Sequence, residues 1–176
     1  TDSIFLPVPA IVNVLAARVL SSTGGETEFA STRTGWRDLP GPLRERLDGA
    51  VLSHRLAHSR RGISAELVER HRSRFDDQRW TSTWTNPSTG ERSLYLASHT
   101  YAVDGDESDE AQALIDDTIA WCTTADRVYT HEWRLGDVLV WDGRAILHRG
   151  RPWPYDEGRT LASVCASATE ADGLAS

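Results

Sequence analysis

A histidine and an arginine near the C-terminal end of the chain have the types and spacing of a metal ligand and an anion clamp. His148 follows an apolar segment that starts at Gly136, and Arg159 comes 159 − 148 = 11 residues later, after a turn at Pro152-Trp153-Pro154. A histidine on a buried β-strand is a good ligand for Fe(II), and an arginine on the antiparallel strand after it can grip a carboxylate through two parallel hydrogen bonds. Taken alone, each residue also has an ordinary explanation, as a hydrogen-bonded core histidine or an ion-paired arginine.

Further motifs favour the chemical interpretation, and they are spread over nearly the whole chain. They are Asp2 to Phe5, Pro7-Val8-Pro9-Ala10, Gly24-Gly25 with Thr27, Ser93 to Leu96 with Ser98-His99, Trp141-Asp142 with Arg144, His148 and Arg159. With these motifs in this order, the sequence resembles the taurine and 2,4-dichlorophenoxyacetate dioxygenases, a family of Fe(II)- and 2-oxoglutarate-dependent oxygenases. It is most similar to the phenoxyacetate branch of that family.

The resemblance implies an iron site made of a His-x-Asp pair and a distant histidine. It places Asp2 as the carboxylate ligand and His148 as the distal ligand, with the first histidine one residue before Thr1. None of the 6 histidines of the chain is followed two residues later by Asp or Glu. We therefore expect residues 1–176 to form a single oxygenase domain that lacks its N-terminal part, including the first iron-ligand histidine.

The ligand set explains the chemistry that the resemblance implies. Two imidazoles and one carboxylate occupy one face of an octahedral iron and leave three positions for 2-oxoglutarate and O2. Arg159 would pair with the far carboxylate of 2-oxoglutarate, and the Thr27 hydroxyl would add a hydrogen bond to it. The expected products are succinate, CO2 and a hydroxylated small organic molecule. Because Asp2 keeps the carboxylate, a hydroxylase is favoured over a halogenase.

The substrate is harder to predict. Relatives that act on sulfonates or aryloxy acids usually carry a second arginine four residues after the clamp, but here that position is Ser163. The taurine and phenoxyacetate activities are therefore not carried over. His99 matches a family position that faces the pocket, and Arg149 and Arg151 could supply a replacement charge. Trp153 could line the entrance or simply pack the turn.

Composition limits the other classes of function. The chain has 176 residues, 39% of them hydrophobic, and a formal net charge of −7, which argues against nucleic acid and anionic membrane surfaces as partners. No apolar run approaches the roughly eighteen residues that a membrane span needs. A small-molecule substrate remains, with homo-oligomerisation left open. Cys122 and Cys165 lack a metal-type spacing and are expected to be free thiols in a reducing cytoplasm.

The pattern of elements predicts a mainly β fold with helical insertions, a double-stranded β-helix (a cupin-like jelly roll). Apolar alternation and turn residues bound the predicted elements. Strands are expected at 11–20, 81–85, 92–96, 128–133, 138–141, 145–148 and 160–165, and helices at 40–51, 64–73 and 111–122.

Two other functions stay open. The chain has 7 tryptophans, which a ligand-binding sandwich would also use, although core packing explains them more simply. Without the first histidine, the chain could be a catalytically incomplete jelly-roll module that only binds a ligand. It could also be a fragment that needs another segment or chain to complete the iron site.

Overall fold

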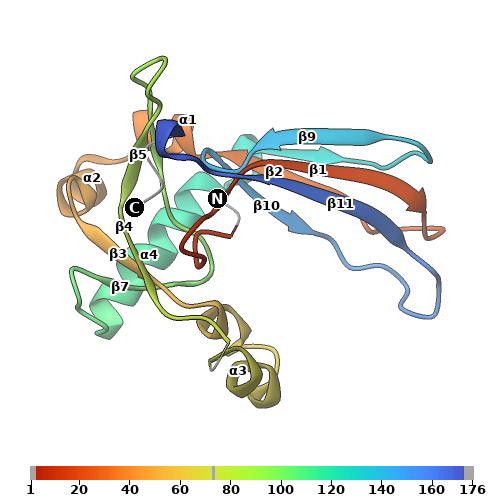
Figure 1. Ribbon diagram of the computed structural model, residues 1–176, viewed down its shortest axis with the longest axis horizontal. Helices are drawn as coiled ribbons and strands as arrows, with labels where there is room; N and C mark the ends of the chain where they lie inside the picture. Colours follow the sequence, from red (N-terminus) through yellow and green to blue (C-terminus); the bar gives the residue numbers. More distant parts are fainter. Residues whose placement is uncertain (1–2, 73, 173–176) are drawn as a thin grey trace.

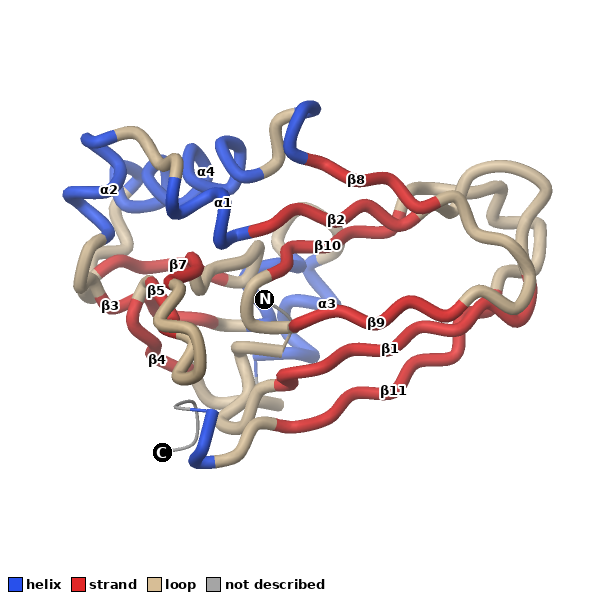
Figure 2. The backbone as a smooth tube through the Cα atoms, turned by 90° about the horizontal axis from the view of Figure 1, so that it is seen from above, coloured by secondary structure: helices blue, strands red, loops and turns tan. Residues whose placement is uncertain are grey.

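Two small antiparallel sheets face each other and form one end of the molecule (Figure 2). A computed structural model describes residues 3–72 and 74–172, so Asp2 lies outside the described residues. The first sheet has the strand order β11-β1-β9, and the second has the order β10-β2-β8. The strands are β1 (Ala10–Val19), β2 (Thr27–Ser31), β8 (Val128–His131), β9 (Val138–Asp142), β10 (Ile146–Gly150) and β11 (Thr160–Ser167).

The register of the first sheet follows from its apolar alternation. Val14 of β1 pairs with Val140 on one side and Val164 on the other, and these last two valines are 64% and 68% exposed. On the opposite face, Trp141 of β9 packs edge-on against Phe29 of β2, with ring centroids 5.1 Å apart. The Trp141 face is therefore the inner face, and the valine row lies on the outside.

Helices and shorter strands close the other end of the molecule (Figure 1). The strands there form one sheet of order β4-β3-β7 and a β5-β6 hairpin. These strands are β3 (Val51–His54), β4 (Gln78–Thr81), β5 (Thr83–Thr85), β6 (Arg92–Leu94) and β7 (Thr100–Val103). The helices are α1 (Thr32–Arg37), α2 (Gly41–Leu47), α3 (Ala65–Arg72) and α4 (Asp109–Cys122), with 3₁₀ turns η1 (Leu56–Arg60), η2 (Ala125–Arg127) and η3 (Glu170–Asp172).

The amphipathic helix α4 anchors the larger hydrophobic core. Its N-cap is Ser108, whose hydroxyl accepts a hydrogen bond from the Ala111 amide at 3.3 Å, and two acidic residues in its first turn suit the helix dipole. Leu114 and Ile115 of its buried face join a cluster that includes Leu52 of β3. A second cluster contains Ile4, Trp84, Tyr95, Ala97 and Ala168.

Most predicted elements are confirmed, but three details differ. Val51 starts β3 instead of ending a helix, because Gly49 adopts φ 78° just after α2. The strand that follows Arg159 pairs with β1 and not with β10, so His148 and Arg159 come from opposite sheets. Strands β2, β3, β4 and β7 and helix α1 were not predicted.

The tryptophans and cysteines behave as expected. None of the 7 tryptophans is classed as exposed, and Trp36 and Trp84 are buried, so packing accounts for them. Cys122 and Cys165 are both free thiols. Within residues 3–72 and 74–172, no helix is both long and apolar enough to cross a membrane.

Candidate active site

His148 belongs to an aromatic group on the inner face of the second sheet. On β10 it lies directly opposite Phe29 of β2, and paired residues of antiparallel strands share a face. Its ring is 6.4 Å from that of Phe29 and 5.1 Å from that of Trp141, measured between centroids. The expectation of a buried histidine is wrong, because His148 is exposed. The space next to it is an open cavity and is not filled by side chains.

Thr27 lies on the same face of β2 as Phe29, two residues before it. Its side chain is buried, and its hydroxyl accepts a hydrogen bond from Trp133 Nε1 at 3.0 Å. The hydroxyl hydrogen remains able to donate to another acceptor. Sequence reasoning did not identify Trp133 as the partner, although the alternation of residues 128–133 already placed Trp133 and His131 on one side, and His131 pairs with Thr27.

Arg159 stands just before β11 and is held by the loop that precedes β2. Its Nη2 donates to the Gly25 carbonyl at 2.6 Å, and its guanidinium lies 4.9 Å from the centre of the Trp153 ring. Its Nε is buried without a hydrogen-bond partner in the part of the chain that the structure describes. Burial lowers the pKa of Arg159, but an arginine this basic stays charged at neutral pH.

The Gly24-Gly25 motif explains how Arg159 comes so close to the β2 loop. Both glycines have positive φ, at 69° and 75°. A Cβ on Gly24 would stand 2.4 Å from the Pro152 carbonyl oxygen, and one on Gly25 would stand 2.6 Å from Arg159 Nε. The Gly25 amide also donates to the Pro152 carbonyl at 3.0 Å. Only glycine permits this backbone path and this close approach.

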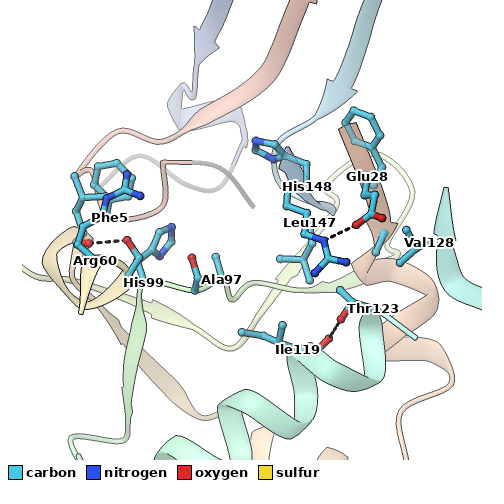
Figure 3. A pocket seen from close by; sticks show the side chains of 16 residues that line it. Phe5, Glu28, Arg60, Ala97, His99, Ile119, Thr123, Val128, Leu147 and His148 are labelled. Carbon is cyan, nitrogen blue, oxygen red and sulfur yellow. Dashed lines mark hydrogen bonds and ion pairs between the residues drawn. The ribbon is translucent and has the colours of Figure 1, made fainter. Parts of the chain in front are cut away.

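A cavity of about 400 Å³ has His148 at one end and His99 at the other (Figure 3). Arg60 and Phe5 lie beside His99 at that end, while Leu147 and Glu28 lie near His148. Its lining includes His148, Arg149 and His99 among the predicted site residues, but not Thr27, Arg159 or Trp153. Arg60 and Glu28 were not identified from the sequence, since no local motif marks either residue.

His99 is buried together with a second histidine, His54. The two rings meet edge to face with centroids 5.6 Å apart, and His54 Nδ1 lies 3.1 Å from Thr100 Oγ1. Burial lowers the pKa of His54 to about 3 and holds the pKa of His99 well below its ordinary value. Both side chains are therefore neutral at pH 7. Of the described atoms, none forms a hydrogen bond with His99 Nδ1.

The two arginines beside His148 share one acidic partner. Glu28 accepts a hydrogen bond from Arg149 Nε and lies 3.3 Å from Arg151 Nη1. Both arginines are largely exposed, at 67% and 51% of their side-chain surface. Their charge is thus partly compensated, and their role in substrate binding stays a prediction.

Ser163 lies on the inner face of β11, four residues after Arg159. It shares this face with Cys165, whose Sγ lies 3.1 Å from Asn13 Oδ1, and Asn13 pairs with Trp141. Ser163 is exposed, so the face is open at this point. A longer side chain at this position would project between the sheets.

Metal binding is tested only in part by the described residues. Residues 3–72 and 74–172 contain no group of three His, Cys, Asp or Glu side chains placed to hold a metal ion. Of the two predicted iron ligands, His148 faces the cavity and Asp2 lies outside the described residues.

The comparison with known proteins identifies the family. Residues 1–165 match the family described as taurine catabolism dioxygenase TauD, TfdA family. The chain is 32% identical over 162 residues to the alpha-ketoglutarate-dependent 2,4-dichlorophenoxyacetate dioxygenase of Burkholderia sp. (strain RASC), a match that covers 92% of this chain and 54% of the relative. It is 31% identical to the (S)-phenoxypropionate/alpha-ketoglutarate-dioxygenase of Delftia acidovorans, covering 99% of this chain and 62% of the relative.

A solved structure extends the likeness to the fold. The crystal structure of AAD-2 in complex with Mn(II) and N-oxalylglycine superposes with a TM-score of 0.87 and 31% identity, covering 97% of this chain and 68% of that one. The chain therefore belongs to the taurine and 2,4-dichlorophenoxyacetate dioxygenase family. It spans between half and two thirds of the length of the two curated relatives just named.

Proposed function

We propose that this chain forms the core of an Fe(II)- and 2-oxoglutarate-dependent dioxygenase that hydroxylates a small organic molecule and releases succinate and CO2. The observation that carries the proposal is the buried Nε of Arg159, which has no hydrogen-bond partner among the described residues, in a side chain that is held by the Gly25 carbonyl two residues before Thr27. The mainly β architecture with facing sheets supports assignment to the double-stranded β-helix, or jelly-roll, type. Family membership supports the cosubstrate assignment.

The residues present fit 2-oxoglutarate. Arg159 has a buried Nε that no described side chain or backbone group satisfies, and an N–H of this kind favours a carboxylate acceptor. Thr27 has a buried hydroxyl that can donate while it accepts from Trp133. AAD-2 binds N-oxalylglycine, which carries the same two carboxylates and oxo group as 2-oxoglutarate.

Each residue of this chain then has a defined task. Arg159 neutralises and orients the far carboxylate of the cosubstrate, and Thr27 fixes the same carboxylate by a hydrogen bond. Phe29 and Trp141 pack against the ring of His148 and orient it. His148 and Asp2 would hold Fe(II), which supplies the oxidising chemistry when it is bound together with O2 and 2-oxoglutarate.

The substrate class is proposed from the substrates of the relatives and from the residue at position 163. The relatives named above act, by their names, on 2,4-dichlorophenoxyacetate and (S)-phenoxypropionate. The exposed Ser163 cannot supply the charge of a second arginine beside Arg159. We therefore propose a small organic substrate that occupies the cavity between His148 and His99, with the anionic group of any substrate bound elsewhere than at Ser163.

The test is anaerobic binding of Fe(II) and 2-oxoglutarate to the wild-type chain and to His148→Ala, followed by succinate assay in air. The proposal expects that wild-type protein binds Fe(II) and that the variant loses this binding. Full iron occupancy in His148→Ala would show that the iron site has been assigned wrongly. Far-UV circular dichroism of both proteins controls for folding.

One observation favours a second candidate, a module that binds 2-oxoglutarate or another ligand without turnover. The described residues offer no complete three-ligand metal site, and two ligands hold iron far more weakly than three. The module predicts 2-oxoglutarate binding without succinate formation. Restoration of turnover by a separately added polypeptide would instead indicate a fragment that needs another segment.

A further inference from the structure

Arg60, at the end of the cavity opposite His148, is a cation with no counterion among residues 3–72 and 74–172. It is the last residue of η1, and its side chain is half-buried where the cavity meets His99 and Phe5 (Figure 3). Within the described parts of the chain, no acidic side chain pairs with it and no hydrogen bond uses its guanidinium. A half-buried arginine left in this way is costly unless a ligand compensates its charge.

Two other arginines near the cavity have acidic partners. Arg55, the residue that precedes η1, forms a bidentate ion pair with Asp77, in which Arg55 Nε lies 2.8 Å from Asp77 Oδ1. Arg149, at the His148 end of the cavity, is bound to Glu28. Arg60 differs from these two arginines because it lines the cavity without an acidic partner among the described residues.

His99 adds an unused polar atom to the same end. The residue is only 6% exposed, its Nδ1 lacks a hydrogen-bond partner among the described atoms, and its ring packs edge-on against Phe5 at 5.2 Å. The positive charge of Arg60 is one of the influences that lower the pKa of His99. Both side chains line the same end of the cavity, where one bound group could contact both (Figure 3).

The charges of the cavity set an orientation for a ligand. At the end near His148 the charge of Glu28 is compensated by Arg149 and Arg151, whereas Arg60 at the other end has no acidic partner among the described residues and would attract an anion. The walls between the two ends are mainly apolar and include Leu56, Ile119 and Leu147. A volume of about 400 Å³ is within the usual range for small-molecule sites.

We propose that Arg60, assisted by His99, binds the anionic group of the substrate, and that the substrate is a small organic acid whose apolar body extends toward His148. This inference rests on the proposed function, because it gives that active site its substrate class. It also assigns the anion-binding role to an element other than β11, where Ser163 replaces the expected arginine. Arg60 is in this sense a specificity-determining residue.

The experiment compares acids with their uncharged amides, without metal or cosubstrate. Isothermal titration calorimetry measures binding of phenoxyacetate and hexanoate, and of phenoxyacetamide and hexanamide, to the wild-type chain. We expect the acids to bind roughly tenfold or more tightly than the amides, since a hydrogen-bonded charge pair contributes on this scale. Arg60→Gln should remove the preference, and Arg60→Lys should retain part of it.

Arg61 provides the matched control. It is the next residue, is exposed, and donates to Gln112 Oε1 at 3.2 Å instead of lining the cavity. Arg61→Gln should keep the preference for acids. Equal binding of acids and amides by the wild type, no binding of either, or equal loss in both glutamine variants would overturn the proposal.

A separate measurement distinguishes failure of the Arg60 proposal from failure of the proposed dioxygenase function. Binding of 2-oxoglutarate with Fe(II) under anaerobic conditions depends on Arg159 and not on Arg60. The Arg60→Gln variant should therefore bind 2-oxoglutarate as the wild type does. Loss of cosubstrate binding in Arg60→Gln would contradict the assignment of Arg60 to the substrate end of the cavity.

Discussion

The proposed cosubstrate site depends on two side chains, Arg159 and Thr27, and neighbouring residues fix the orientation of each. Arg159 is positioned by the Gly25 carbonyl and the Trp153 ring, while its Nε remains available. Thr27 is positioned by Trp133. A half-buried cation with a buried, unpartnered Nε and a buried hydroxyl, each fixed by its neighbours, would form a preorganised carboxylate site that needs little rearrangement on binding.

Replacing Thr27 by valine tests the hydroxyl while almost conserving the shape of the side chain. Thr27→Val should lower the free energy of unfolding by about 1 kcal/mol, because Trp133 Nε1 loses its acceptor. It should also weaken 2-oxoglutarate binding. Urea unfolding and calorimetry measure the two effects, and Thr27→Ser, which keeps the hydroxyl, serves as the control. Wild-type 2-oxoglutarate affinity in the valine variant would remove Thr27 from the cosubstrate site.

The buried His54 predicts a loss of stability on mild acidification. Its pKa is about 3 in the folded chain and about 6.5 in the unfolded chain, so the unfolded state binds the extra proton as the pH falls below 6.5. Between pH 7 and pH 5 this effect should lower the free energy of unfolding by about 2 kcal/mol. The wild type and His54→Gln are compared by urea unfolding at both pH values. An equal pH dependence in the two proteins would contradict the prediction.

At the scale of elements, helix α1 and helix α4 touch through a glycine. A Cβ on Gly35 would lie 2.5 Å from Cys122 Sγ, and Trp121 Nε1 donates to the Gly35 carbonyl at 3.2 Å. Glycine is normally unfavourable inside a helix, so this position trades helix propensity for close packing. Helix α1 follows β2 directly, and this contact therefore helps to fix the strand that carries Thr27 and Phe29.

A double-variant cycle tests the contact between the two helices. Gly35→Ala should lower the free energy of unfolding by about 1–3 kcal/mol through overpacking, despite the better helix propensity of alanine. Cys122→Ala removes the sulfur and should make Gly35→Ala much less harmful. Chemical denaturation of the two single variants and the double variant gives the coupling energy. Additive effects of the two substitutions would show that the helices do not meet at this point.

The elements that the sequence predicted are those with clear periodicity. The face of α4 and the apolar strands β1, β9 and β11 lie as expected, because local pattern and burial agree there. β2 was missed because Glu28 and Thr27 interrupt its apolar character, and the partners that explain both residues are distant in sequence. The exposure of His148 was also missed, since a histidine next to an open cavity has the same local sequence as one in a filled core.

At the scale of the whole molecule, the predicted cosubstrate residues Thr27 and Arg159 are separate from the residues that line the cavity. Thr27 accepts a hydrogen bond from Trp133 and Arg159 is held by the Gly25 carbonyl, whereas the cavity leads from His148 toward Arg60 of η1 (Figure 3). The family resemblance predicted the first group of residues. Arg60 could not be predicted, because η1 reaches the cavity only through tertiary packing. The cosubstrate and substrate ends should therefore respond to different substitutions.

The most direct test of the central claim separates iron from cosubstrate in the Arg159→Ala variant. Anaerobic titrations measure Fe(II) binding first and 2-oxoglutarate binding to the iron-loaded protein second. We expect Arg159→Ala to bind Fe(II) as the wild type does and to bind 2-oxoglutarate roughly tenfold or more weakly, because one charged hydrogen-bonding partner is lost. Unchanged 2-oxoglutarate affinity in a correctly folded Arg159→Ala protein would contradict the account.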